Sequence, residues 1–326
     1  MPKVSLAEIE ETTRSALRRH GAADGPAREV ARAVAQAEAH GNRICGLYYV
    51  ESYCQQLLSG RVKGDVVAEV STPRPGTVRV DAKFGFAQPA FFEGLETAVQ
   101  AARTNGVASL AICHAHTCTS LGYFTESIAR KGLIGLGFTN ATPIVAAPGA
   151  KTRVIGTNPI AFSVPDGKGG LAMQFDQSTT TVALGKITMA KAAGTPIPEG
   201  WAVDQDGNPT TDPEAALAGS LVSVGGYKGW GFGLMAEILA AGLTGGLLSK
   251  DVAPLKASEG APHDLGQFYL LIDPGTSEAF GARLAALAEA ASADPGARMP
   301  GQHRAAVDPV EVPDAVWARM KELAQV

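Results

Sequence analysis

The sequence lacks a long apolar segment. No run of apolar residues reaches the roughly 20 that a membrane-spanning helix needs. The first residues, MPKVSLAEIEETTR, contain no apolar stretch of the kind that forms a secretory signal. We therefore expect no membrane partner and a cytoplasmic location.

The sequence also lacks an excess of charge of either sign, with 28 Lys and Arg residues against 32 Asp and Glu residues. Such a balance argues against nucleic acid as a partner. Four cysteines in 326 residues are too few for a disulfide framework, so we expect free thiols. With 45% hydrophobic and 18% charged residues, the composition is globular and predicts one large domain or two interleaved ones.

Common catalytic and metal-binding signatures are absent as well. There is no P-loop and no G-x-S-x-G motif. Residues 231–236, GFGLMA, match G-x-G-x-x-A, but the segment before Asp251 makes a poor second strand, so we do not expect an ordinary Rossmann domain. Cys113, His114, His116 and Cys118 lie close together, but no second pair with zinc spacing follows. We therefore expect no metal site.

What is present is a regular alternation of helix and strand signals, which predicts an α/β protein. Ser5 and Glu8 form a capping box for a first helix. The predicted helices are 5–20, 26–39, 46–58, 89–104, 123–131, 182–193, 233–241, 277–291 and 313–324, and the predicted strands are 76–81, 107–113, 133–139, 160–164, 171–175 and 267–272. Turn residues 165–167 predict that the strands on either side of them pair antiparallel.

Polar residues gather at the ends of the predicted strands, where α/β proteins commonly bind ligands. They are residues 139–140, 156–159, 176–179 and 227–229. Hydroxyls, backbone N–H groups and a lysine are what a pyrophosphate and a ribose require, which makes Thr139 and Thr157 candidate cofactor contacts. The alternative is that each segment is an ordinary cap or turn.

Three segments resemble the malate/L-lactate dehydrogenase family, a non-Rossmann group of NAD(P)-dependent oxidoreductases that includes Δ1-piperideine-2-carboxylate reductases. They are residues 132–165, GLIGLGFTNATPIVAAPGAKTRVIGTNPIAFSVP, residues 195–213, TPIPEGWAVDQDGNPTTDP, and residues 225–239, GGYKGWGFGLMAEIL. The resemblance covers about residues 5–310. It implies a homodimer in which a mixed-sheet NAD(P)-binding domain, 79–254, packs against a discontinuous, mainly helical domain, 1–78 with 255–326.

The same resemblance implies NAD(P)H as the cofactor, with NADP slightly favoured over NAD. The implied cofactor contacts are Phe175, Asp176, Gln177, Ser178, Thr179, Thr180, Tyr227, Lys228, Gly301, Gln302 and His303. The implied substrate is a small carboxylate.

The sequence departs from the family pattern at the proton donor. Family members usually carry Ser-His-Gly between the second and third helices, with an arginine four residues beyond the histidine. Here the residues are Ile44-Cys45-Gly46, with Tyr49 at the arginine position. Cys45 is either a replacement acid or a small buried side chain.

Two further residues are candidates for the catalytic site. His116 matches the first histidine of the family's Ser-His-His segment and is a candidate replacement polar group. Asp176 matches the family's aspartate after the strand 171–175 and could orient such a group or hold a cationic substrate near the nicotinamide.

A site without the usual histidine but with a carboxylate suits a substrate that is protonated before the hydride arrives. We therefore expect a reductase of cyclic 2-imino acids such as Δ1-pyrroline-2-carboxylate or Δ1-piperideine-2-carboxylate. One alternative is a 2-hydroxy-acid dehydrogenase of the malate or lactate type. The other is a non-catalytic relative that only binds nucleotide.

Overall fold

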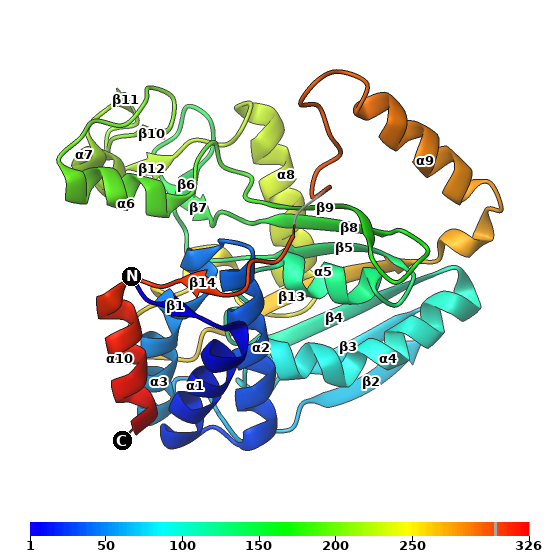
Figure 1. The fold of residues 1–326 in the computed structure, drawn as a ribbon. Coiled ribbons are helices and arrows are strands. Elements are labelled where there is room, and N and C mark those ends of the chain that lie inside the picture. The colour runs from blue at the N-terminus through cyan, green and yellow to red at the C-terminus, as the bar shows by residue number, and fades with distance from the viewer. Residues whose placement is uncertain (303–304, 326) are drawn as a thin grey trace.

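A mixed sheet of seven strands dominates the computed structural model, which describes residues 1–302 and 305–325 (Figure 1). The strand order is β2-β3-β4-β13-β5-β8-β9. β3 and β4 run parallel, and every other neighbouring pair runs antiparallel. The strands are β2 (Glu69–Arg74), β3 (Thr77–Asp81), β4 (Val107–Ala115), β5 (Ile134–Thr139), β8 (Ile160–Pro165), β9 (Leu171–Gln177) and β13 (Leu265–Ile272).

Helices cover both faces of this sheet. α4 (Ala87–Asn105) and α5 (Gly122–Ala129) pack on one face, where Leu110 and Ile112 of β4 join their apolar cluster. Ala111 points to the opposite face, as alternation along a strand requires, and packs with α8 (Tyr227–Glu237). α8 continues as a π-helical turn, Ile238–Gly242.

A helical unit beside the sheet is built from both ends of the chain (Figure 1). The Ser5–Glu8 capping box predicted for the start of α1 is present, with both of its hydrogen bonds formed. Two 3₁₀ turns, Arg43–Cys45 and Leu47–Tyr49, precede α3, whereas the sequence predicts a single helix from residue 46. The elements of this unit are α1 (Leu6–Arg19), α2 (Asp24–Ala39), α3 (Val50–Ser59), α10 (Asp314–Gln325) and the pair β1 (Lys3–Val4) and β14 (Val310–Glu311).

A third, smaller layer surrounds a five-stranded sheet of order β11-β10-β12-β6-β7. Its strands are β6 (Val145–Ala146), β7 (Arg153–Ile155), β10 (Ala202–Val203), β11 (Pro209–Thr210) and β12 (Ser220–Leu221), and its helices are α6 (Leu184–Ala193) and α7 (Pro213–Ala218). The remaining elements are α9 (Phe280–Ala291) and the 3₁₀ turns Ser249–Asp251 and Pro274–Thr276. Figure 1 shows the small sheet and α9 at opposite ends of the molecule.

The structure confirms the predicted α/β architecture with a mixed sheet and differs from the sequence analysis at two strands of the large sheet. β2 was not predicted from the sequence; five of its six residues are exposed. β13 lies in the range 255–326 that the predicted domain division places with the helices, yet it pairs with β4 and β5 at the centre of the large sheet. Its residues LGQFYLLI carry no charge and are mostly buried, as a central strand requires.

The G-x-G-x-x-A match at residues 231–236 lies inside α8. It forms no tight turn between a strand and a helix, which a dinucleotide fingerprint needs. The prediction that this match does not mark a Rossmann domain is therefore confirmed.

Candidate functional site

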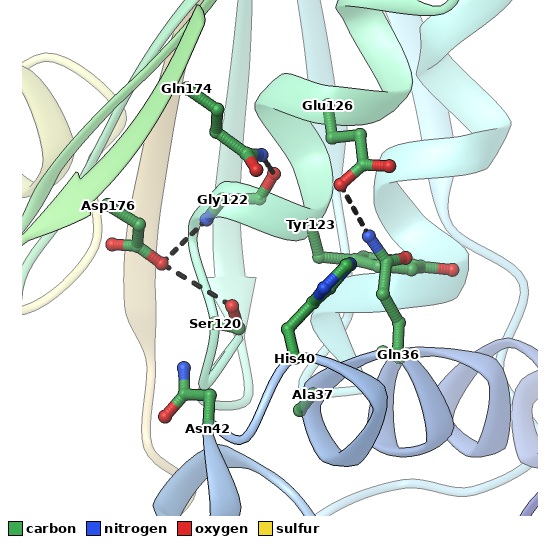
Figure 2. Close-up of a pocket in the computed structure, with 11 residues that line it drawn as sticks. Gln36, Ala37, His40, Asn42, Ser120, Gly122, Tyr123, Glu126, Gln174 and Asp176 are labelled. Carbon is green, nitrogen blue, oxygen red and sulfur yellow. Dashed lines mark hydrogen bonds between the residues drawn. The ribbon is translucent and has the colours of Figure 1, made fainter. Parts of the chain in front are cut away.

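Asp176 lies near the end of edge strand β9 and faces the start of α5 (Figure 2). Its Oδ2 atom accepts a hydrogen bond from the backbone N–H of Gly122 at 2.8 Å and one from the hydroxyl of Ser120 at 3.4 Å. A carboxylate at a helix N-terminus is stabilised by the N–H groups and dipole of that helix. The first turn of α5 therefore fixes the position of this carboxylate.

The carboxylate borders a cavity of about 70 Å³ between α2, α5 and β9. Two amides are held in place there: Gln36 donates to Glu126 at 2.6 Å, and Gln174 donates to the carbonyl of Gly122 at 3.0 Å. The lining residues are Ala33, Gln36, Ala37, His40, Asn42, Ser120, Gly122, Tyr123, Glu126, Gln174 and Asp176. The cavity is thus a polar chamber of a size that suits a small charged group.

A groove of about 850 Å³ adjoins this cavity, and Gln36, His40, Glu126 and Gln174 line both. The segment around Gly301 forms one wall of the groove and covers the free edge of β9. The backbone N–H of Gln174 donates to the carbonyl of Pro300 at 2.9 Å. A Cβ at Gly301 would lie 2.8 Å from the carbonyl oxygen of Gln174, so this close approach requires glycine. Cavity and groove together have room for a ligand of cofactor size.

Cys45 ends the first 3₁₀ turn after α2 and is partly exposed. Burial raises the pKa of its thiol to about 12, and the nearby charge of Asp176 contributes to that shift. The thiol therefore keeps its proton at neutral pH and is a much weaker acid than an imidazolium.

Tyr49, at the position that corresponds to the family arginine, is a neutral donor. Burial raises the pKa of its hydroxyl to about 12. The ammonium of Lys256 lies 3.0 Å from the ring centroid of Tyr48 and 4.7 Å from that of Tyr49. A positive charge is therefore present beside position 49, but it comes from the segment before β13.

His116 is buried, with 2% of its surface exposed, and does not line the cavity beside Asp176. Its ring stacks on that of His263 at 4.0 Å, and its Nε2 atom lies 2.7 Å from Oε1 of Gln56. Because the Gln56 amide nitrogen donates to two backbone carbonyls, those of Leu255 and Ala257, its Oε1 accepts from His116 Nε2. The other ring atom, Nδ1, has no hydrogen-bond partner among the described residues.

The environment of His116 keeps it neutral. Burial holds the pKa of His116 well below its usual range, and the neighbouring His263 and Arg61 lower it further. Its one proton is on Nε2 and is shared with Gln56, so the geometry favours a positioning role for His116 over proton donation to a substrate.

Several predicted cofactor residues meet at the start of α8. The backbone N–H and the hydroxyl of Thr179 both donate to the carbonyl of Thr157, at 2.9 and 3.0 Å. Thr180 and Ser223 form an isolated antiparallel β-bridge, and the backbone N–H of Val224 donates to the carbonyl of Thr179 at 3.0 Å. These contacts place Thr157 and the segment 178–180 beside the loop that leads into α8.

The backbone of that loop is open to solvent beside a lysine. Gly225 and Gly226 both have φ of +61°, and no atom lies within 4 Å of the position where a Cβ would stand on either. Lys228, in the first turn of α8, is exposed and forms no ion pair within the described residues. Open backbone, hydroxyls and a cation at a helix N-terminus fit a pyrophosphate.

The remaining predicted contacts lie in other surroundings. Thr139 is 5% exposed, and its hydroxyl donates to the carbonyl of Gly266 at 3.0 Å, so it serves the packing of β5 against the start of β13. Phe175 packs against Phe162, and Gln177 is exposed at the end of β9. Tyr227 is 79% exposed. Gln302 accepts from the backbone of Met299, and His303 lies outside the described residues.

The sequence analysis did not select His40, Asn42, Ser120 or Gln174, which line the cavity with Asp176 (Figure 2). Ser120 stands at a junction between a strand and a helix, and that position was an available signal. His40 and Asn42 follow the end of α2 and are brought to β9 by the packing of the helical unit on the sheet. No local pattern predicts that contact.

Comparison with known proteins agrees with this architecture. The sequence model of the malate/L-lactate dehydrogenase family matches residues 4–321. The chain belongs to this family. The sequence-based assignment to these oxidoreductases is therefore confirmed.

Two curated relatives share 38% identity with the chain. One is a (2R)-3-sulfolactate dehydrogenase (NADP(+)) of Chromohalobacter salexigens, aligned over 98% of both chains. The other is a Δ1-pyrroline-2-carboxylate/Δ1-piperideine-2-carboxylate reductase of Pseudomonas putida, aligned over 93% of this chain and 89% of the relative. A crystal structure of Δ1-piperideine-2-carboxylate reductase from Pseudomonas syringae pvar. tomato superposes with a TM-score of 0.91 at 33% identity. It covers 99% of this chain and 100% of that one.

Two further predictions, of free thiols and of no membrane-spanning helix, concern the chain as a whole. All four cysteines are free, and three of them are buried. Among the described residues, no helix is both long enough and apolar enough to cross a bilayer.

Proposed function

We propose that the protein is an NAD(P)H-dependent reductase of small cyclic 2-imino acids such as Δ1-pyrroline-2-carboxylate or Δ1-piperideine-2-carboxylate. The observation that carries the proposal is the carboxylate of Asp176, held by Gly122 N–H at the edge of a polar cavity, in a chain whose residue at the donor position, Cys45, is a thiol with a pKa of about 12. Relatives at 34–38% identity that carry these reductase names support it.

The two reaction types place different demands on these residues. Reduction of a ketone develops negative charge on oxygen and needs a good proton donor within reach. A cyclic imine is protonated on nitrogen before reduction and carries a positive charge. Asp176 is suited to hold that cation, while Cys45 need not give up its proton.

The reduced nicotinamide, when bound, supplies the hydride for this reaction. We assign its phosphates and ribose to the segment 178–180, to the loop at Gly225 and Gly226, and to Lys228. The groove beside Gly301 is assigned to the same cofactor. NADP is slightly favoured over NAD, in line with the NADP(+) in the name of the sulfolactate dehydrogenase relative.

The second candidate function is a 2-hydroxy-acid dehydrogenase. The sulfolactate dehydrogenase relative, at 38% identity, favours it. In that case Cys45 or Tyr49, each with its proton bound at neutral pH, would donate to the substrate oxygen. The third possibility is a relative that binds nucleotide without turnover.

A substrate panel with both cofactors tests the proposal. We expect NADPH oxidation with Δ1-pyrroline-2-carboxylate and Δ1-piperideine-2-carboxylate to have a higher kcat/KM than with pyruvate, oxaloacetate or sulfopyruvate. Faster turnover of the keto acids would favour the dehydrogenase. Tight NADPH binding, measured by fluorescence titration, without turnover of any substrate would favour the nucleotide-binding relative.

We also propose a homodimer, formed through the exposed face of α8 and its π-helical turn. Tyr227 is 79% exposed, Phe232 53%, Ile238 63% and Leu243 53%, a concentration of apolar surface that marks interfaces between proteins. A second copy of the chain is the occupant we assign. Phe232→Glu with Ile238→Glu should shift the sedimentation coefficient from that of a dimer to that of a monomer, and a wild-type monomer would contradict the assignment.

A cytoplasmic location is part of the same proposal. It rests on the four free cysteines, which fit a reducing compartment.

A further inference from the structure

A β-bulge at the end of β4 brings Cys113 and His114 to one side of the chain. Leu265 pairs with Ala115 and Gln267 pairs with Ile112, so Cys113 and His114 together oppose the single residue Gly266. Consecutive side chains of a regular strand point to opposite faces. Here His114 has φ of +49°, which turns its ring out of that alternation.

Asp81, at the end of β3, joins this pair from the neighbouring strand. It is paired in parallel register with Cys113, and its Oδ1 atom lies 2.9 Å from Nδ1 of His114. The ligand-type atoms of Asp81, Cys113 and His114 all lie within 4.8 Å of one another. Tetrahedral zinc places neighbouring ligand atoms about 3.3–3.8 Å apart. The Asp81–His114 pair would open by about 0.4 Å and give up its hydrogen bond, and the widest pair would close by about 1 Å.

A second carboxylate lies beside these three residues and adds negative charge that favours a cation. The Oδ1 atom of Asp264, in the loop before β13, is buried and has no hydrogen-bond partner among the described residues. Asp264 directly precedes Leu265, which pairs with Ala115, so it lies beside the bulge that carries Cys113 and His114. Among the described residues neither Asp81 nor Asp264 forms an ion pair with a lysine or arginine. Lys83 pairs with Glu69, and Arg79, whose charge acts on Cys113, donates to the carbonyl of Thr244. A buried carboxylate oxygen without a donor is costly, and a cation removes that cost.

We propose that Asp81, Cys113 and His114 form a site for a divalent transition metal ion, with Zn²⁺ as the ion that the mixed oxygen, sulfur and nitrogen set prefers. Three protein ligands leave a fourth tetrahedral position for water. Binding releases the thiol proton of Cys113 to solvent, because the thiolate is the ligand. Side chains of His114 and Asp81 are 35% and 41% exposed, so the ion can reach the site from solvent.

The sequence analysis predicted no metal site because it considered only residues that are close in sequence: Cys113, His114, His116 and Cys118. The third ligand comes from residue 81, more than thirty positions earlier, and enters through strand pairing. His116 and Cys118 are not part of the site: His116 is stacked on His263 at the far end of the same segment. The site joins β3 and β4 next to the loop that carries Asp264, so a bound ion would stabilise that junction whatever reaction the enzyme performs.

Binding of Co²⁺, a spectroscopic substitute for Zn²⁺, tests the site on the intact chain. The protein is treated with chelator, dialysed and titrated with Co²⁺, and bound metal is counted by mass spectrometry. We expect one Co²⁺ per chain, with a near-ultraviolet absorption band from thiolate coordination, and displacement by one equivalent of Zn²⁺. We also expect Zn²⁺ to raise the melting temperature and EDTA to reverse the rise.

Matched variants locate the ion. Cys113→Ser should remove the thiolate band, and His114→Gln should abolish stoichiometric binding; their controls, Cys54→Ser and His20→Gln, should leave both unchanged. Asp264→Asn keeps all three ligands and should weaken binding by about 10–100-fold, as loss of an outer carboxylate typically does. Circular dichroism confirms that each variant is folded.

Two results would overturn the proposal. One is the absence of stoichiometric Co²⁺ and Zn²⁺ binding by the wild-type chain. The other is binding that persists unchanged in folded His114→Gln and Asp81→Asn variants, which would place the ion elsewhere. Neither result bears on imine reduction, because the readout is metal bound and not turnover.

Discussion

The backbone nitrogen of Gly122 and the carboxylate of Asp176 lie 2.8 Å apart, so the first turn of α5 holds a side chain of β9 at the edge of the cavity. The anchor is a backbone N–H, so the fold itself positions the carboxylate. A preorganised negative charge is what stabilisation of an iminium requires. The same contact also limits position 122, where a Cβ would lie 3.1 Å from that of Asp176.

Asp176→Asn tests the role of this charge. The amide keeps the shape of the side chain and removes its charge, so kcat/KM for cyclic imines should fall much further than kcat/KM for keto acids. Steady-state kinetics with both substrate types measure the difference. Ser120→Ala, which removes the weaker 3.4 Å contact to the same carboxylate, is the control and should change kcat/KM only slightly. An Asp176→Asn enzyme with undiminished kcat/KM for imines would end the iminium hypothesis.

Replacement of Cys45 tests the proton donor. The thiol holds its proton at neutral pH because its pKa is raised to about 12. Cys45→His introduces a group with a pKa near 6.5, and this should raise kcat for keto acids more than for imines. Cys45→Ala should leave imine reduction unchanged. If Cys45→Ala abolishes turnover of every substrate while NADPH binding stays intact, the thiol is essential and the argument from imine protonation fails.

Lys228→Ala tests the proposed contact between the start of α8 and the cofactor. Loss of a charged contact to phosphate or ribose should weaken cofactor binding by about 1–3 kcal/mol. The loss should appear in the KM of the cofactor and hardly in kcat, since the contact is the same in the ground and transition states. Lys250→Ala, another exposed lysine, should leave this KM unchanged. Equal cofactor KM values for the two variants would remove Lys228 from the cofactor site.

Part of this site can be predicted from the sequence, and the rest depends on contacts between distant segments. Asp176 and the hydroxyl segment 178–180 come at the end of a strand that the sequence predicts from the turn residues 165–167 before it. The resemblance to the family also points to them, so the sequence predicts these residues as part of the site. His40 and Asn42 were not selected because the contact between the helical unit and β9 has no local signal. His116 was selected by its position in the motif, but its role depends on Gln56 and His263, which come from distant elements.

The fold shows the same division between local and non-local information. The capping box at Ser5 and the antiparallel β8–β9 pair depend on neighbouring residues and were predicted. The place of β13 between β4 and β5 depends on pairing across more than a hundred residues. Its apolar sequence indicates a buried strand but does not identify its partners.

Gly266 provides a stability test at the start of β13. A Cβ there would overlap the carbonyl oxygen of Ala240 and the hydroxyl of Thr244. Ala240 belongs to the π-helical turn, so its carbonyl cannot move away without shifting that turn. Gly266→Ala should therefore destabilise the protein by about 3 kcal/mol or more. Gly281→Ala is the matched control, because no atom lies within 4 Å of its Cβ position in α9, and it should stabilise by about 0.5–1 kcal/mol. Urea unfolding compares the two, and equal midpoints would contradict the overlap.

The pH dependence of stability should reveal the buried imidazole of His263. Burial and the charge of Arg61 together lower its pKa to about 3, so the ring stays neutral in the folded protein. An unfolded chain binds a proton below about pH 6.5. The contribution of this group is therefore fully present above pH 6.5 and is lost as the pH falls from there towards 3, at about 1.4 kcal/mol for each pH unit.

His263→Gln separates this effect from general acid destabilisation. Glutamine can still accept the hydrogen bond that Thr117 N donates to Nδ1 at 3.2 Å, but it does not titrate. Between pH 7.5 and pH 5.5 the wild type should lose about 1–1.5 kcal/mol more than the variant, because the unfolded variant has one proton fewer to bind. Urea unfolding at the two pH values measures both losses. Parallel pH profiles for wild type and His263→Gln would mean that His263 is protonated in the folded protein, and its stacking on His116 would then have to accommodate a charge.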